Sequence, residues 1–267
     1  MKIFIKTYDK DAEWLKYALQ SIQVHASDYA SDVVVATETE FLPAIEAVLR
    51  EASGRVPVRL LDVYDALPEA KDIHPGYFRQ VYVKMMADKI VGTDHFQMDS
   101  DMIFWRKPGT DLDDVWYYGR NVPSAWSEIT SKLTSLPPDG TEHMRTAGQH
   151  VKVEALRIAR HYLTGRIGDL AMFCTAHGTR DNNSAFTAFS EYDVIGRIVR
   201  EFAPTLYNFR LIDAQHPWDA RGWPLIKGWS WGGLDARALD YIQKCLRGEV
   251  TYPDRIPEPN DVQWAAP

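Results

Sequence analysis

Two carboxylates stand at one-residue spacing in Asp99-Ser100-Asp101, within an otherwise apolar run from Phe96 to Trp105. The apolar neighbours predict a buried strand that ends at the two acids. Burying an unpaired ionised carboxylate costs on the order of several kcal/mol or more, so the pair requires a neutralising partner. A hard divalent cation is the simplest partner, because Mg²⁺ or Mn²⁺ takes one or two protein carboxylates and completes its shell with water and phosphate oxygens.

Two alternatives to a metal stay open for these acids: they pair with Arg or Lys, or they sit in a turn that water reaches. A D-x-D triplet alone is a weak pattern, so its surroundings matter. On the helix expected before it, Gln80 and Lys84 are four residues apart and share a face. That helix leads directly into the strand, so a cation here could meet a diphosphate, although a solvated polar stripe is the commoner use of such residues.

The elements that must position these residues alternate along the first part of the chain. Apolar runs predict strands at 2–8, 33–36, 58–63 and 96–99, separated by helices around 14–22, 41–51 and 77–90. Such alternation favours a mostly parallel sheet with helices on both faces. In an open α/β sheet, ligands bind at the carboxyl ends of the strands, which is where the two acids fall.

The later part of the chain has a looser pattern. Helices are expected over 149–162, 185–202 and 236–246, and the Pro-rich end from residue 253 is expected to be loosely held. The stretch 211–233 is rich in Trp, Gly and Pro and is expected to be irregular. Its tryptophans either fill the core or line a pocket that stacks on sugar rings.

Two segments resemble a known family. Gly76-Tyr77-Phe78-Arg79-Gln80 through Lys84, followed by the Asp-Ser-Asp strand, resembles the nucleotide-sugar-dependent glycosyltransferases of the GT-A fold, in particular a little-characterised bacterial and viral group. The segment Ser190-Glu191-Tyr192 is similar to a second segment of that group. In the order of elements the resemblance covers roughly residues 1–235. It implies a GT-A-like, Rossmann-like three-layer α/β sandwich with a mostly parallel mixed central sheet.

The resemblance also implies an activity and a cofactor. Asp99 and Asp101 would hold Mn²⁺ or Mg²⁺ on the diphosphate of a nucleotide sugar, with a UDP-sugar favoured. The metal would act as a Lewis acid on the leaving diphosphate, and Lys84 would share that charge. Asp101 and Glu191 are the candidate catalytic residues, with Glu191 as the general base that deprotonates an acceptor hydroxyl. Capping of a helix is the alternative role of Glu191.

Further residues are assigned to the donor and the metal by the same resemblance. Thr7, Tyr8 and Asp11 would contact the nucleobase and ribose, with helix capping and packing as the alternative, and Gln80 would join Lys84 and Asp99 in donor binding. His216 is the best-placed third metal ligand by chain order, and His177 is the second.

Length and composition predict one catalytic domain. In the 267 residues we expect a nucleotide-sugar-binding half (1–105), an acceptor-binding half (106–250) and a tail (251–267). No apolar run reaches the roughly 18 to 20 residues of a membrane span, and the first residues lack the features of a signal peptide, so a cytoplasmic protein is expected.

The acceptor stays open among lipid, protein, glycan, small metabolite and nucleic acid. The basic stretch 143–166 favours nucleic acid, and the net charge of −7 disfavours it. Two other functions remain as alternatives. D-x-D carboxylates also serve nucleotidyl and phosphoryl transfer with two metals. A non-catalytic carbohydrate-binding relative would use the tryptophans instead.

Overall fold

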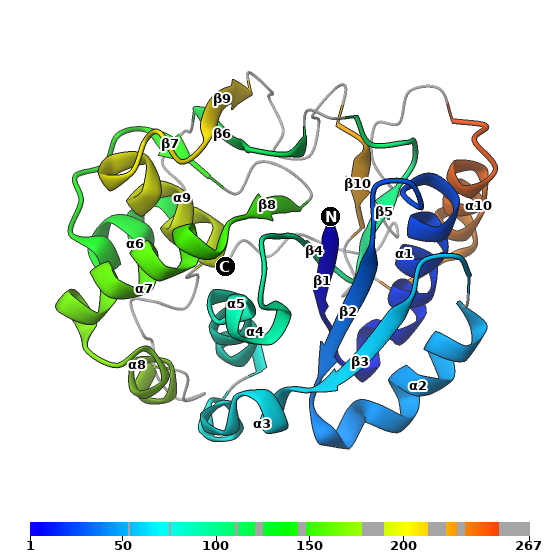
Figure 1. Ribbon diagram of the computed structural model, residues 1–267, viewed down its shortest axis with the longest axis horizontal. Helices are drawn as coiled ribbons and strands as arrows, with labels where there is room; N and C mark the ends of the chain where they lie inside the picture. The colour runs from blue at the N-terminus through cyan, green and yellow to red at the C-terminus, as the bar shows by residue number, and fades with distance from the viewer. Residues whose placement is uncertain are drawn as a thin grey trace.

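The centre of the molecule is a five-stranded sheet in the order β3-β2-β1-β4-β8 (Figure 1). A computed structural model describes residues 1–52, 54–74, 76–109, 112–120, 125–143, 148–177, 190–212, 223–228 and 233–250. The four strands β1, β2, β3 and β4 run parallel, and β8 is antiparallel to β4. The strands are β1 (Lys2–Lys6), β2 (Asp32–Thr37), β3 (Val58–Asp62), β4 (His95–Asp99) and β8 (Gln149–Val151).

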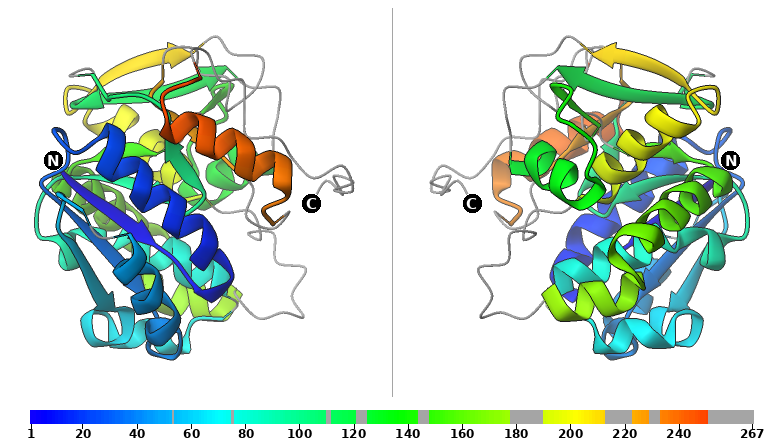
Figure 2. Two further views of the ribbon diagram at one scale, coloured as in Figure 1. Left: turned by 90° about the vertical axis from the view of Figure 1, so that its right-hand side faces the viewer. Right: turned by 90° about the vertical axis from the view of Figure 1, so that its left-hand side faces the viewer.

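Helices cover both faces of this sheet and create two hydrophobic cores. Successive side chains of β1 alternate between them: Ile3 and Ile5 enter one core, and Phe4 enters the other. The first core lies under α1 (Ala12–His25), α2 (Leu42–Glu51) and α10 (Ala236–Leu246), and Figure 2 shows α10 crossing beside α1. The second lies under α4 (Gly76–Met85), α5 (Ala87–Val91) and α7 (Val153–Ile167).

Two smaller sheets complete the fold. A three-stranded sheet has the order β7-β6-β9, and a two-stranded sheet pairs β10 with β5. Their strands are β5 (Met102–Phe104), β6 (Val115–Arg120), β7 (Thr141–Glu142), β9 (Asn208–Ile212) and β10 (Leu225–Lys227). The remaining helices are α3 (Val63–Ala66), α6 (Ala125–Thr134), α8 (Leu170–His177) and α9 (Glu191–Phe202).

The predicted three-layer α/β arrangement with a mostly parallel mixed sheet is confirmed. The predicted helix over 77–90 is instead two helices, because Met86 leaves the helical conformation at φ −106° and ψ 10°. The predicted helix over 149–162 begins with strand β8, which pairs with β4 before α7 starts. The stretch 211–233 is not wholly irregular, since it contains β10 and the end of β9. Among the described helices, none is long and apolar enough to cross a membrane.

Candidate functional site

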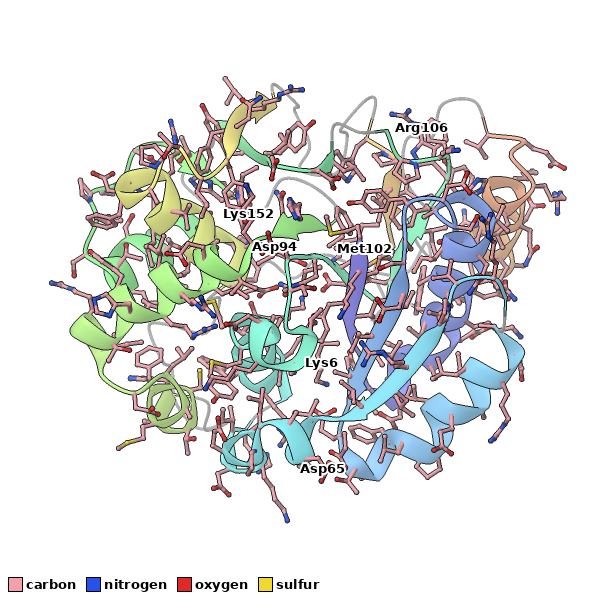
Figure 3. All side chains as sticks on the ribbon, viewed as in Figure 1. Lys6, Asp65, Asp94, Met102, Arg106 and Lys152 are labelled. Carbon is pink, nitrogen blue, oxygen red and sulfur yellow. The ribbon has the colours of Figure 1, made fainter. Side chains whose placement is uncertain are left out.

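The carboxyl ends of the parallel strands meet at one edge of the central sheet. Lys6, labelled at the end of β1 in Figure 3, is in register with Asp99 at the end of β4. From β1 the chain builds the sheet through β2 and β3 on one side and then returns to add β4 on the other. A crevice for ligands forms where an α/β sheet changes direction in this way, so the site is expected beside the ends of β1 and β4.

Two lysines and three carboxylates gather at this position, and we call them the lysine–carboxylate cluster. Its members come from four separate parts of the chain: Lys84, Asp99, Asp101, Glu191 and Lys227. Lys84 Nζ donates to Asp99 Oδ1 and, over 2.8 Å, to Glu191 Oε1. Lys227 Nζ lies 2.5 Å from Asp99 Oδ2 and 3.7 Å from Asp101 Oδ1. All five side chains are largely buried.

Each member of the cluster stands at an end of an element. Asp99 ends β4, and Asp101 lies in the turn that leads to β5. Lys84 lies in the last turn of α4. Glu191 is the first residue of α9, where the positive end of the helix dipole favours a carboxylate. Lys227 ends β10. Side chains at such ends can converge without interrupting the sheets.

The position of Lys227 is fixed by its neighbour in the chain. The Gly228 N–H donates to the Asp101 carbonyl over 2.7 Å, which ties the end of β10 to the Asp-Ser-Asp turn. A Cβ atom on Gly228 would lie 2.3 Å from the ring of Trp14 in α1. Only glycine permits this approach of backbone to ring. Lys227 is therefore held beside Asp101 by the backbone.

The charges of the cluster stabilise one another. Burial by itself would raise the pKa of Asp99, but the ammonium groups of Lys227 and Lys84 hold that pKa well below its usual range. Burial would lower the pKa of Lys84, and Asp99 and Glu191 instead raise it well above its usual value. The pKa of Lys227 is raised in the same way, against burial, by Asp101 and Asp99. Both lysines therefore stay protonated at neutral pH.

A second group of buried charges flanks the cluster at the ends of β1 and β2. Lys6 Nζ lies 2.7 Å from Glu38 Oε2, and Arg79 Nη1 lies 3.4 Å from Glu38 Oε1. Burial lowers the pKa of Lys6, against the attraction of Glu38. Two cations thus face one carboxylate here, at the same edge of the sheet.

The residues predicted to hold the nucleoside lie at this edge in different surroundings. Asp11, in a short 3-10 turn, accepts a hydrogen bond of 3.0 Å from Ser100 Oγ and so lies against the Asp-Ser-Asp turn. Thr7 is fully buried, and its carbonyl accepts from Lys6 Nζ over 2.7 Å. Tyr8 has an extended backbone before that turn. Gln80 is half-buried on α4, one turn before Lys84. Their contacts with a nucleoside stay a prediction.

The two acids do not fit a divalent cation in this arrangement. Their donor chemistry is suitable, since carboxylates plus phosphate oxygens satisfy Mg²⁺ or Mn²⁺. However, each oxygen of Asp99 already accepts from an ammonium group, and Lys227 Nζ lies between Asp99 and Asp101. A metal bound there would lie beside two positive charges. Within the described parts of the chain, no three Asp, Glu, His or Cys side chains are grouped to hold a metal ion.

Of the two residues predicted as a third metal ligand, the structure describes only one. His216 lies outside the described residues, as do Trp218, Trp229 and Trp231. The second candidate, His177, ends α8, and its ring packs 4.4 Å from that of Phe173 between centroids. Trp223 packs in the core against Tyr117 at 4.8 Å. For this tryptophan, the core alternative is the observed one.

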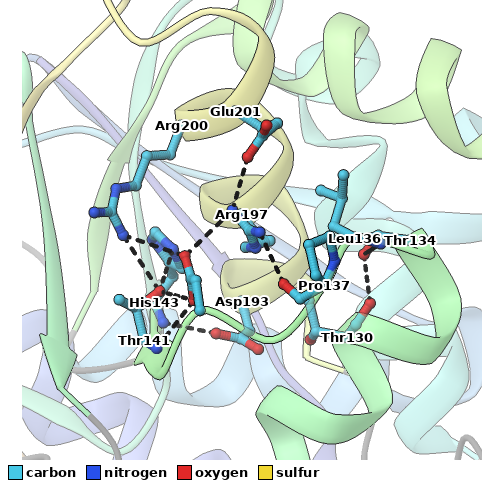
Figure 4. A network of polar contacts seen from close by, with 11 residues as sticks. Thr130, Thr134, Leu136, Pro137, Thr141, His143, Asp193, Arg197, Arg200 and Glu201 are labelled. Atoms are coloured by element: carbon cyan, nitrogen blue, oxygen red, sulfur yellow. Dashed lines mark hydrogen bonds and ion pairs between the residues drawn. The ribbon is translucent and has the colours of Figure 1, made fainter.

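A network of polar contacts anchors α9, which carries Glu191 (Figure 4). We call it the arginine–aspartate network; its members are Asp139, His143, Asp193, Arg197 and Arg200. Asp193 Oδ1 accepts from the His143 N–H over 2.6 Å, and Arg197 donates to the Pro137 carbonyl over 3.0 Å. A Cβ atom on Gly196 would lie 2.6 Å from the His143 ring, so the close approach of α9 requires glycine.

Sequence reasoning found four members of the cluster, Lys84, Asp99, Asp101 and Glu191, but missed Lys227. It also missed Lys6, Glu38 and Arg79. The available signal was the one used for Asp99: Lys6 and Lys227 each follow an apolar run at the end of a buried strand. A charge at that point requires a partner for the same reason. The strand β10 was not predicted, because it lies in the stretch 211–233 that was expected to be irregular.

Comparisons with known proteins give only distant structural neighbours. No protein-family model matches the chain, and no curated protein matches it. Mouse xyloside xylosyltransferase 1 in its apo form is similar over 79% of this chain and 84% of its own, at 12% identity and a TM-score of 0.43. An active-site mutant of LgtC is similar over 70% of this chain and 68% of its own, at 14% identity and a TM-score of 0.37. The function must therefore follow from the site's own residues.

Proposed function

We propose that this protein is a glycosyltransferase that moves a sugar from a nucleoside diphosphate sugar, with a UDP-sugar favoured, to an acceptor hydroxyl. The observation that carries the proposal is the lysine–carboxylate cluster at the ends of β1 and β4. Ligands bind at this point in α/β sheets. The cluster also unites the residues of both segments that resemble glycosyltransferases, since Lys84 contacts Asp99 and Glu191 together.

The residues of the site can be given roles on this proposal. Buried cations beside the leaving diphosphate would stabilise the negative charge that develops there. Lys84 is suited to this role because its ammonium group stays protonated. Glu191 is the proposed general base that takes the proton of the acceptor hydroxyl. Its carboxylate is held 2.8 Å from Lys84 Nζ at the start of α9.

The dependence on Mn²⁺ or Mg²⁺ that the sequence predicts is a separate question from sugar transfer itself. If a metal binds, Asp99 and Asp101 are the residues that would hold it, and it would supply a Lewis acid for the diphosphate. In the structure, Lys84 pairs with Asp99, and Lys227 lies beside both acids. We therefore assign no step of the reaction to a metal.

The acceptor is left unassigned. The basic stretch 143–166, which favoured nucleic acid, is partly neutralised within the fold. Arg160 forms a pair of hydrogen bonds with Asp88 at 2.5 and 2.7 Å, and Lys152 lies 2.7 Å from Asp114. These partners reduce the positive charge that this stretch offers to phosphates.

Thermal unfolding with nucleoside diphosphates tests the donor. UDP, GDP, ADP, CDP and dTDP would each be added in the presence of either EDTA or Mn²⁺. At saturation, the cognate nucleotide is expected to raise Tm by about 5 °C or more. Asp101→Ala should abolish this shift, whereas Lys244→Met, which changes an exposed ion pair on α10, should keep it. Failure of every nucleotide to stabilise the protein in both conditions would refute the proposal.

Product analysis separates sugar transfer from the two alternatives. A glycosyltransferase incubated with its nucleotide sugar releases the nucleoside diphosphate, and slow hydrolysis does so even without an acceptor. Release of pyrophosphate instead would indicate nucleotidyl transfer. An intact donor, with sugar bound, would indicate a carbohydrate-binding protein.

A further inference from the structure

Lys227 occupies the position between the two acids where a cation was expected from the sequence. Its ammonium nitrogen lies 2.5 Å from Asp99 Oδ2 and 3.7 Å from Asp101 Oδ1. We infer that Lys227, together with Lys84, takes the place of a divalent metal and binds the diphosphate of the donor directly. This inference rests on the proposed function and names the groups that contact the leaving diphosphate.

The fold holds this ammonium group at the site. β10 pairs antiparallel with β5, with Lys227 opposite Met102. The Gly228 N–H donates to the carbonyl of Asp101 itself. The side chain of Lys227 is 12% exposed, so its charge is neither solvated nor free to move far. Such a lysine is part of the site's permanent charge, because removing a partner from a buried ion pair is costly.

The carboxylates of the ion pairs at this edge of the sheet already have buried cations as partners. Four cations and four carboxylates form these ion pairs. The cations are Lys6, Arg79, Lys84 and Lys227, and the carboxylates are Glu38, Asp99, Asp101 and Glu191. A divalent metal would enter a site whose acids are already neutralised. A diphosphate would instead meet ammonium groups, each with three N–H donors that phosphate oxygens accept well.

Each lysine can donate to a phosphate while it keeps its carboxylate partners, because an ammonium group has three N–H donors. The 3.7 Å between Lys227 Nζ and Asp101 Oδ1 exceeds the length of a hydrogen bond, so shifting the ammonium group from Asp101 toward a phosphate breaks none between these two atoms. Lys84 is held between Asp99 and Glu191 and lies 5.2 Å from the ring centroid of Tyr192. The carboxylates thus act as positioning groups for the two cations.

The reaction balances without a metal. The bond between the anomeric carbon and the diphosphate oxygen breaks, and its electron pair stays on that oxygen. The acceptor oxygen forms the new bond to the anomeric carbon, and its proton passes to Glu191 in the proposed role of base. Lys84 and Lys227 stabilise the diphosphate by charge and hydrogen bonds and transfer no proton.

Calorimetric titration with the best nucleotide from the melting panel, UDP in the first instance, tests this inference. The wild type is expected to bind UDP with the same affinity, within about threefold, in EDTA and in Mn²⁺. In EDTA, Lys227→Met should weaken binding about 10-fold to 100-fold, the range for one charge-assisted hydrogen bond. Lys227→Arg, which keeps the charge, should retain most of the affinity.

Two further variants separate binding from folding. Lys227→Met leaves Asp101 without its nearby cation, so Asp101→Asn/Lys227→Met removes one charge of each sign and should fold while binding as weakly as Lys227→Met. Lys244→Met, on the exposed face of α10, should bind as the wild type does.

The results that would overturn the role of Lys227 differ from those that would refute the proposed function. A wild-type affinity that falls tenfold or more on chelation would show that a metal binds the diphosphate, and would overturn the inference while leaving a glycosyltransferase. Unchanged affinity of both Lys227→Met proteins in EDTA would also overturn it. Absence of binding by any nucleoside diphosphate, with and without Mn²⁺, would refute the proposed function itself.

Discussion

Two charged regions meet at helix α9 and differ in how far backbone groups hold their charges. In the lysine–carboxylate cluster, the contacts of Lys84 and Lys227 join side chain to side chain. In the arginine–aspartate network, Arg197 and Arg200 pair with the side chain of Asp139, but in addition Asp193 accepts from a backbone N–H and Arg197 donates to a backbone carbonyl. Side-chain partners can be exchanged for a ligand's atoms. Backbone partners cannot leave without local unfolding.

This difference separates binding from support. The cluster lies at the carboxyl edge of the sheet, where ligands bind in α/β folds, and the contacts described for its two lysines are to other side chains. The network lies further along α9 and fixes that helix, so that Glu191 stays beside Lys84. We therefore expect substitutions in the cluster to change ligand affinity, and substitutions in the network to change stability alone.

The largest effect is expected from Asp99→Ala. This change leaves Lys84 and Lys227 buried without their shared acceptor, which typically costs about 3–5 kcal/mol of stability. The loss is measured by urea unfolding, with Asp240→Ala on the exposed face of α10 as the control. UDP should no longer stabilise the variant. A loss as small as that of the control would contradict a cluster held by Asp99.

Asp193→Ala is expected to have a smaller effect on stability. It leaves the buried His143 N–H without its acceptor, at a cost of about 1–3 kcal/mol. At a temperature where the variant is folded, its affinity for UDP should change less than about threefold, in contrast to Lys227→Met. An equal loss of affinity in both variants would remove the distinction between the two regions.

A third expected effect concerns pH and His143. Burial, with Arg200 nearby, lowers the pKa of His143 to about 3, whereas an unfolded histidine titrates near ~6.5. The unfolded chain therefore binds a proton that the fold does not, and stability falls as pH drops from about 6.5 toward 3. In His143→Gln, the drop between about pH 7.5 and pH 5 should be smaller by about 2 kcal/mol.

Urea unfolding of both proteins at the two pH values provides the measurement. In His143→Gln, the fall in stability with decreasing pH should be reduced and not abolished, because burial also lowers the pKa of His95 and of His150. An identical drop in wild type and His143→Gln would mean that His143 is already protonated in the folded protein near pH 5.

Much of the first half of the fold could be predicted because local patterns determine it. Strands buried on both faces read as apolar runs, as Val33–Val35 does in β2. In helices with one apolar face, apolar residues recur at helical spacing, as Leu15, Leu19 and Ile22 do in α1. The pairing of β8 could not be predicted, because Gln149–Val151 is too short for its period to distinguish a strand from the start of α7.

The candidate site was predictable where its residues belong to a local motif. Asp99 and Asp101 stand in an apolar run, and Lys84 lies on the helix before it. Lys227 gives no local sign of its partners, since the contact with Asp99 joins residues on separate sheets. The sequence left open both a metal and a basic residue as the neutralising cation, and favoured the metal.

The sequence by itself determined that two acids end a buried strand and require a positive partner, because an unpaired charge is too costly to bury. It also determined the alternating order that places them at the carboxyl edge of a parallel sheet. Only the tertiary structure decided which cations fill that need. The close contact of Gly228 with Trp14 and its hydrogen bond to Asp101 bring Lys227 to the acids, and those contacts exist only once α1, β5 and β10 are packed together.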